Sequence, residues 1–430
     1  MTHLKDLTLR GQYHDDFYST SSSMASSSKI ETLEIYSADL PERHLSESHF
    51  SERHLSERPS ASRDLAQFIC KMTHLKNLTI KGPYHDDFYL TASSMVSSAK
   101  IETLKFLLDL FESRSASRAL VQFICKMTHL KKLTLHGQYH DALYSTVSSM
   151  ALSVKIENLD IDSVDLNERP FASRDLAQFI CKMTHLKNLT LGGQYHYAFY
   201  STSSLKASSA KIETLEIYSA DLIERPLASR DLAQFICKMT HLKNLTLKSQ
   251  YHDDFYSTSS SMASSAKSCN TSPTLTELTV EDDTLEGWQD CGSVFDNVKR
   301  VTIQVRSTIN CDVIQRIHLP GATELTIQAD VYAPQPAGFH EEPTSLPNAL
   351  LMISPQLVKV TFSDLDIGNS NMELILQTFR SPHNLKHLKI IRFIRCGSDE
   401  GVDDVILACN KDQVMEVEVE RGKPRRLLFD

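Results

Sequence analysis

The sequence repeats one block of residues almost unchanged, and this repetition constrains the fold more than any other feature. The block Met-Thr-His-Leu-Lys starts at Met1, Met72, Met127, Met183 and Met239, with spacings of 71, 55, 56 and 56 residues. Self-similarity at a fixed period is typical of solenoid proteins, in which each unit stacks on the next. Because one short solenoid turn takes about 20 to 29 residues, each period should contain two turns.

Each turn carries the pattern L-x-x-L-x-L, where L is an apolar residue. The third period shows both copies, Leu130/Leu133/Leu135 and Ile156/Leu159/Ile161, which start 26 residues apart. This spacing predicts a short strand whose apolar side chains point into the core. Fifteen such triplets are expected, ending with Leu385/Leu388/Ile390 and Val414/Val417/Val419; the others start at Leu4, Ile30, Leu75, Ile101, Leu130, Ile156, Leu186, Ile212, Leu242, Leu275, Val298, Ala322 and Leu357.

The stretches between the strands should return along the opposite side of the sheet, mainly as helices. In second turns this return is 62–70 and its copies, where Ser62 suits an N-cap and Asp64 suits the first helical turn. In first turns it is a serine-rich stretch such as 15–25, for which a weaker helix is predicted because serine is a poor helix former. The predicted fold is therefore α/β, a horseshoe-shaped solenoid with a parallel concave sheet and a mainly helical convex side.

We expect one elongated domain that contains two stretches of different regularity. Residues 1–267 hold regular paired turns, and a charged insertion at about 41–59 should loop out; residues 268–430 continue the solenoid with degenerate repeats. Met1 is the repeated block's own methionine, and no unit with a polar outer face precedes Leu4. We therefore expect a fragment of a longer protein, and whether Met1 is the natural start stays open.

Charge and composition argue against several function classes. A net charge of −9 and a pI near 6.1 disfavour binding to nucleic acid or to an anionic membrane. The chain has no run of about 18 apolar residues and no secretory signal, so a cytoplasmic location is expected. Cysteines at one repeat position should lie at least about 9 to 10 Å apart, too far for a disulfide; they are Cys70, Cys125, Cys181 and Cys237.

No motif with catalytic spacing is present. The sequence lacks G-x-x-x-x-G-K-[ST], G-x-S-x-G, H-E-x-x-H and C-x-x-C. His14-Asp-Asp16 recurs at 85–87 and 252–254 but is altered in the other copies, so helix capping by the aspartates is favoured over a metal site. Asn77-Leu-Thr79 and its copies match a glycosylation sequon, but they lie within predicted concave strands. We therefore predict no enzymatic activity, no cofactor and no metal.

The alternating spacing, the paired turns and the helical convex side resemble the ribonuclease-inhibitor class of leucine-rich repeats. The resemblance covers residues 1 to about 267. That class includes the C-terminal sensor arrays of NACHT-type (NOD-like) innate immune receptors, and the segment 173–191 is similar to such arrays in marine invertebrates. The resemblance implies a sensor whose NACHT and death-fold regions would lie upstream of this chain. One departure is the usual Asn or Cys position, which holds Gln138 and its equivalents in first turns.

The concave face is the predicted binding site. The second consensus position is Lys in first turns, from Lys5 onward, and Glu in second turns, from Glu31 onward. Neighbouring strands lie about 4.8 Å apart, so a ladder of alternating charges that mainly fixes the stacking is expected. Positions that diverge between otherwise identical repeats suit recognition better. The candidate ligand-binding residues are Arg10, Tyr36, Lys76, Lys81, Lys131, His136, Asp162, Lys187, Tyr218, Lys243 and Lys248.

The sequence therefore predicts a non-enzymatic recognition solenoid that binds a protein or microbial ligand on its concave face. The first interpretation is the sensor part of a NACHT-type innate immune receptor. The alternative is a stand-alone cytosolic inhibitor or adaptor of ribonuclease-inhibitor type that binds one protein partner. A nucleotide-binding domain upstream would favour the receptor, and a capping repeat with a native start would favour the inhibitor. A ubiquitin-ligase adaptor would need an F-box-like segment, which the sequence lacks.

Overall fold

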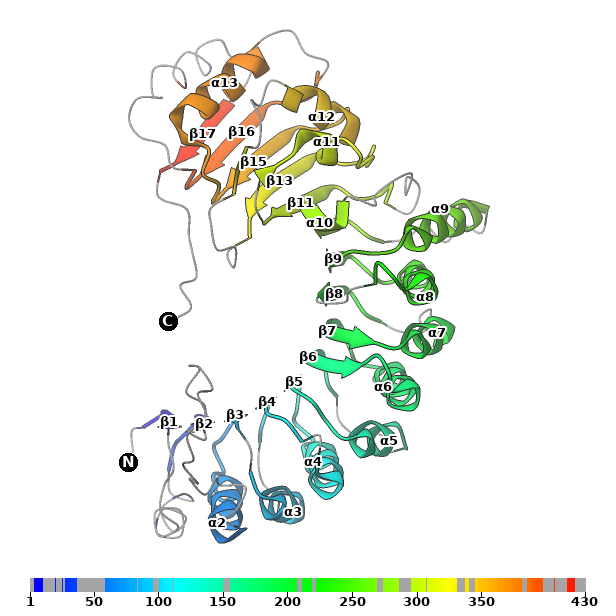
Figure 1. Ribbon diagram of the computed structural model, residues 1–430. Helices are drawn as coiled ribbons and strands as arrows, with labels where there is room; N and C mark the ends of the chain where they lie inside the picture. Colours follow the sequence, from blue (N-terminus) through cyan, green and yellow to red (C-terminus); the bar gives the residue numbers. More distant parts are fainter. Residues whose placement is uncertain are drawn as a thin grey trace, which may run out of the picture. The chain divides into compact units, whose positions relative to one another are not determined.

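Short strands and helices alternate along the chain in the computed structural model (Figure 1). By its internal contacts the chain divides into two units, Met1–Ile212 and Glu213–Asp430. The structure describes residues 4–10, 20, 25, 28–36, 59–82, 84–95, 100–110, 112–149, 155–206, 211–218, 222–268, 274–285, 295–306, 308–330, 337–339, 345–380, 385–396, 406 and 416–421. The predicted insertion at 41–59 lies outside these residues except for Pro59.

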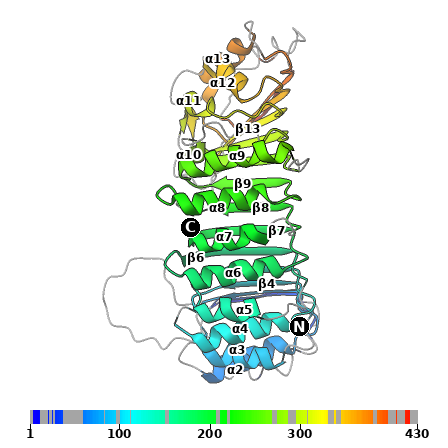
Figure 2. The same cartoon turned by 90° about the vertical axis from the view of Figure 1, so that its right-hand side faces the viewer.

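In the first unit, seven described strands form a parallel sheet in chain order, with helices along one side of it. Figure 2 shows the helices stacked next to one another in the same order. We call the opposite side of the sheet the concave face. The strands are β1 (Asp6–Arg10), β2 (Thr32–Tyr36), β3 (Asn77–Lys81), β4 (Thr103–Leu107), β5 (Lys132–His136), β6 (Asn158–Leu166) and β7 (Asn188–Tyr195), and the helices are α2 (Pro59–Cys70), α3 (Asp86–Met95), α4 (Arg114–Lys126), α5 (Asp141–Ser149), α6 (Pro170–Lys182) and α7 (Tyr197–Lys206).

The second unit repeats this plan with eight described strands in its parallel sheet. These are β8 (Thr214–Tyr218), β9 (Asn244–Lys248), β10 (Glu277–Glu281), β11 (Arg300–Val305), β13 (Glu324–Ala329), β15 (Lys359–Ser363), β16 (Ile390–Ile394) and β17 (Glu416–Glu420). A separate parallel pair joins β12 (Thr308–Ile309) to β14 (Gly338–Phe339). The helices are α8 (Pro226–Cys237), α9 (Asp253–Ser268), α10 (Asp282–Leu285), α11 (Cys311–Ile314), α12 (Leu346–Ile353) and α13 (Gly368–Arg380).

The predicted α/β fold with an open parallel sheet and helices between the strands is confirmed, and it is compatible with a leucine-rich repeat solenoid. The apolar triplets form the core as expected. In β5, Leu133 and Leu135 are at most 4% exposed, and they alternate with outward polar residues. Full burial of such a side chain contributes about 1.5–3 kcal/mol, and the contribution recurs in every turn. The predicted change in regularity at residue 267 stays a prediction.

One predicted triplet is wrong by three residues. The structure places Ile391 opposite Val360 and Phe393 opposite Phe362, so the core triplet of β16 is Leu388/Ile391/Phe393 and not Leu385/Leu388/Ile390. Ile390 lies on the other side of the strand and is partly exposed. The error arises because Leu385 and Leu388 are followed by both Ile390 and Ile391, so two registers fit the pattern. The last triplet is confirmed at Val417, which pairs with Ile391, while Val414 lies outside the described residues.

The serine-rich stretches of the first turns form helices, as predicted for α3, α5, α7 and α9. Their serine hydroxyls donate back to carbonyls of the same helix, as Ser93 Oγ does to Leu90 O at 2.8 Å. Two apolar residues near each helix start are buried, for example Phe88 and Tyr89 in α3 and Leu143 and Tyr144 in α5. This packing stabilises helices whose intrinsic propensity is low.

The predicted N-cap role of Ser62 is wrong. Helix α2 begins three residues earlier at Pro59, so Asp64 also lies beyond its first turn. Helices α6 and α8 likewise begin with a proline at N1, where the missing N–H costs no hydrogen bond. The serine equivalent to Ser62 is buried inside each helix, and Ser173 Oγ donates to Leu166 O at 3.1 Å. The serine therefore ties the helix to the preceding strand end.

Glycine is required where β5 ends. Gly137 has φ +117°, and a Cβ there would lie 2.3 Å from the carbonyl oxygen of Leu108 in the neighbouring turn. Both the left-handed backbone and the close approach exclude a side chain. This turn therefore depends on the absence of a Cβ.

Two non-glycine residues with left-handed backbone follow neighbouring strands of the second unit. Asp364 (φ +58°) follows β15, and Arg395 (φ +50°) follows β16. The Asp364 carboxylate is 2% exposed and accepts two hydrogen bonds from the Arg395 guanidinium, at 2.7 and 2.8 Å, and one from Ser363 Oγ at 2.8 Å. Arg395 Nη1 also donates to Glu420 at 3.0 Å. This ion pair joins the ends of β15, β16 and β17.

The repeat cysteines are buried or half-buried free thiols. Burial raises the pKa of Cys70 and Cys237 to about 12 and that of Cys125 to about 11. These thiols are poor nucleophiles, since the thiolate is the reactive form. Within the described part of the chain, no helix is long and apolar enough to cross a bilayer.

A candidate recognition surface on the concave face

One outward position in each of the strands β1 to β6 forms a lateral row in the first unit. In parallel register, Arg10 pairs with Tyr36, Tyr36 with Lys81, and Lys81 with Leu107. Leu107 then pairs with His136, and His136 with Asp162. We call this set of six residues the recognition row. The structure thus brings five of the predicted site residues together with Leu107, while Tyr218 and Lys248 form an equivalent lateral pair in the second unit.

The first residues of the recognition row contact one another directly. The guanidinium carbon of Arg10 lies 5.3 Å from the centre of the Tyr36 ring, which is a cation–π distance. Tyr36 Oη donates to Glu34 Oε2 at 3.2 Å. Burial raises the pKa of Tyr36, and the neighbouring Glu34 charge adds to the effect, so the phenol stays protonated at neutral pH.

At the other end of the row, His136 forms a polar pair with an aspartate that sequence reasoning missed. His136 Nε2 lies 3.1 Å from Asp160 Oδ2, and both side chains are about one-third exposed. The hydrogen bond to Asp160 raises the pKa of His136, and the charges of Asp160 and Asp162 raise it further. The imidazole therefore holds a proton more readily than a solvent-exposed histidine does.

The predicted charge ladder exists as separate lysine–glutamate pairs across neighbouring strands. Each lysine that follows a second turn contacts the glutamate of that turn through its Nζ atom. These hydrogen bonds lower the pKa of Glu31 and Glu102. Four predicted site residues are therefore engaged within the chain: Lys76 with Glu31 at 3.0 Å, Lys131 with Glu102 at 2.9 Å, Lys187 with Glu157 at 3.1 Å, and Lys243 with Glu213 at 2.7 Å.

Two further lysines belong to the concave face but were missed from the sequence. Lys105 and Lys132 are exposed, outward-facing residues of β4 and β5. A signal was present, because Lys105 stands where other second turns have Glu34, Asp160 or Glu216. Such a reversal of charge at one repeat position marks a chemical difference between turns. Sequence reasoning missed it because it compared only the second and seventh consensus positions.

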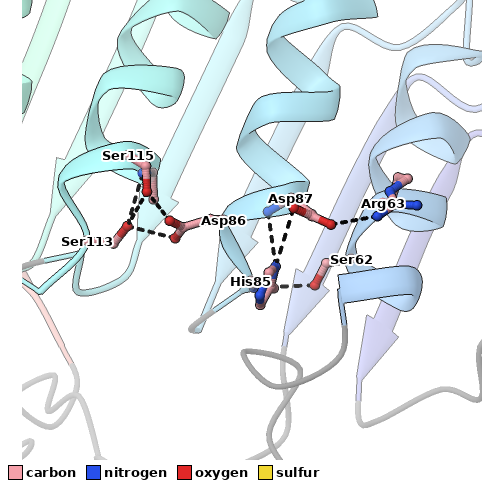
Figure 3. Close-up of polar contacts among 8 residues, drawn as sticks. Ser62, Arg63, His85, Asp86, Asp87, Ser113 and Ser115 are labelled. Carbon is pink, nitrogen blue, oxygen red and sulfur yellow. Dashed lines mark hydrogen bonds and ion pairs between the residues drawn. The ribbon is translucent and has the colours of Figure 1, made fainter.

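The His-Asp-Asp motif caps helices through its histidine, which corrects the predicted role of the aspartates. His85 Nδ1 accepts the backbone N–H of Asp87 at 3.2 Å at the start of α3 (Figure 3). The same contact forms at 3.0 Å between His140 and Ala142, where the second aspartate is absent. The aspartates instead connect neighbouring turns, and Arg63 Nη2 donates to Asp87 Oδ2 at 2.7 Å (Figure 3). Asp86 likewise accepts from the serines that begin α4.

Among the described residues, no group of three or more His, Cys, Asp or Glu side chains is arranged to hold a metal ion. No protein-family model matches the sequence, and no curated protein matches it either.

Proposed function

We propose that this chain is a non-enzymatic recognition solenoid that binds a protein or microbial ligand on its concave face. We further propose that it is the sensor part of a NACHT-type receptor of the ribonuclease-inhibitor class, working in the cytoplasm. One observation carries the first proposal: the recognition row changes chemistry at every turn while the apolar frame beneath it repeats. A rigid frame with variable outward side chains presents a preorganised surface, which lowers the ordering cost of binding.

The composition of the row also supports recognition of a protein. It combines arginine, tyrosine, lysine, leucine, histidine and aspartate within six laterally adjacent positions. Tyrosine and arginine are enriched among residues that dominate the binding energy of protein interfaces. The described cysteines are free, which supports a reducing compartment.

The test begins with peptides selected from a random displayed library for binding to the full chain. Hydroxyl-radical footprinting of the chain, with and without a selected peptide, then shows which side chains the peptide covers. A ligand on the concave face should protect Tyr36 and His136 from oxidation. Phe171 and Tyr197, which are 73% and 47% exposed at helix starts, serve as controls and should stay reactive. The double variant Lys81→Ala and His136→Ala should lose most of the binding. Protection of the helix-start residues alone would overturn the proposal.

A further inference from the structure

Three lysines form a diagonal across adjacent strands of the first unit. Lys105 lies opposite Thr79 on β3, and Lys81 is two residues further along that strand. Lys132 is two residues before Thr134, which lies opposite Lys105 on β5. One strand step of about 4.8 Å combined with two residues of about 3.3 Å each gives a Cα spacing of about 8 Å. We call Lys81, Lys105 and Lys132 the lysine diagonal.

The lysine diagonal differs from the paired lysines on the same face. Within the part of the chain that the structure describes, no ion pair involves Lys81, Lys105 or Lys132. The adjacent Lys131 is bound by Glu102 at 2.9 Å, so its charge is largely neutralised. All three diagonal lysines are exposed. Their ammonium groups are therefore available to a ligand.

The surface around the lysine diagonal is basic although the chain as a whole carries a net charge of −9. The outward positions of β3, β4 and β5 contain no acidic residue. They are Asn77, Thr79, Lys81, Thr103, Lys105, Leu107, Lys132, Thr134 and His136. Acidic outward residues return on the flanking strands, with Glu34 on β2 and with Asp160 and Asp162 on β6. The basic patch is three strands wide.

We propose that this patch binds an extended acidic segment of the partner protein. Alternate side chains of an extended peptide lie about 7 Å apart on one face, close to the about 8 Å step of the diagonal. Acidic residues at positions i, i+2 and i+4 would each meet one lysine, and Leu107 offers an apolar contact beside them. The proposal rests on the recognition function and names the chemistry of its ligand.

The flanking acidic residues favour a short acidic peptide over a nucleic acid. A longer polyanion that crosses the sheet would meet Glu34 on one side and Asp160 on the other. Like charges placed opposite one another oppose binding and select against such partners. A single-stranded oligonucleotide is therefore the discriminating competitor.

The experiment uses the full chain and a fluorescein-labelled synthetic peptide of alternating glutamate and threonine, followed by fluorescence anisotropy. The triple variant Lys81→Gln, Lys105→Gln and Lys132→Gln should weaken binding by about twofold to fivefold for each lysine, so on the order of 10-fold to 100-fold in total. Added salt should weaken binding to the unmodified chain and have little effect on the variant. A peptide of the same composition with contiguous glutamates should bind less tightly.

The matched control is the double variant Arg63→Gln and Asp87→Asn, which removes one charge of each sign from an ion pair between helices of the same unit. Its affinity should stay within about twofold of the unmodified chain. Circular dichroism checks that all variants keep their fold. Three results would overturn the inference: unchanged affinity in the triple variant, equal affinity for the contiguous peptide, or tighter binding of oligothymidylate than of the peptide. A concave footprint with selected peptides but no binding of the glutamate peptide would leave the recognition function standing and remove only this inference.

Discussion

The buried ion pair between Asp364 and Arg395 allows a quantitative test of what holds the ends of β15 and β16 together. Asp364 is 2% exposed, and two of its three described hydrogen bonds come from the guanidinium. Arg395→Ala would remove both guanidinium donors from this buried carboxylate. Removal of one partner of a buried pair costs about 3–5 kcal/mol. For Arg395→Ala we expect a loss of about 3 kcal/mol, the lower end of this range. The Arg395 side chain is 19% exposed, so water can replace some of the hydrogen bonds that the guanidinium donates.

Amide hydrogen exchange followed by mass spectrometry measures this effect locally, which suits a repeat protein whose turns do not unfold as one unit. Since 1.4 kcal/mol is a factor of ten, exchange in the peptides that contain β15 and β16 should be about 100-fold faster in the Arg395→Ala variant. Arg395→Gly should recover about 1 kcal/mol of that loss, because glycine adopts φ +50° without the steric cost. Exchange in β4 and β5, in the other unit, serves as the internal control.

The double variant Asp364→Asn and Arg395→Ala separates buried charge from lost packing. Asparagine tolerates the left-handed backbone and carries no charge, so the double variant should exchange more slowly than Arg395→Ala alone. Equal or faster exchange would refute the reasoning, since it would show that the unpaired carboxylate is not the source of the instability.

Three further predictions concern the first unit. Gly137→Ala should destabilise β5 by about 1–3 kcal/mol or more, because φ is +117° and the added Cβ meets Leu108 O. Amide hydrogen exchange in β5 should therefore be faster, and exchange at the wild-type rate would contradict this prediction. His140→Ala removes the N-cap of α5 and should cost about 1 kcal/mol, with faster exchange in α5 but not in α3. The pKa of His136 should lie above its unfolded value of about 6.5 in an NMR titration, so its stabilising contribution is full below that pH and is lost as the pH rises through the folded pKa. Asp160→Asn should return the pKa toward 6.5, and an unchanged titration would contradict the assignment.

The sequence predicted the frame of this fold better than its details. The triplet Leu130/Leu133/Leu135 and its equivalents could be identified from the sequence. Their side chains are buried, and buried positions that lie three and then two residues apart must be apolar. The same rule failed at Leu388, where five apolar residues between 385 and 393 fit two registers. Helix starts were harder, because Ser62 has the chemistry of an N-cap, whereas the helix begins at Pro59, a residue type that also favours a helix start.

For the candidate site, too, the sequence predicted the positions of residues better than their contacts. Divergent positions such as Lys81 and His136 were visible in the sequence, and the register of the strands then placed them in one row. The partner of each charge was not visible beyond the repeated lysine–glutamate pairs. Whether Lys131 or its neighbour Lys132 is available to a ligand depends on which side chain reaches Glu102 across the strands.

The lateral register has a consequence for how such a surface changes over evolutionary time. Each of the turns that contain β1 to β6 places one residue in the recognition row, and its row neighbours come only from the turns before and after it. Duplication or deletion of one 56-residue period would therefore insert or remove two adjacent residues of the row. The repeated leucines would keep the same core packing between the turns that become neighbours. Recombination between repeats can therefore change the chemistry of this row with no point mutation and no new core.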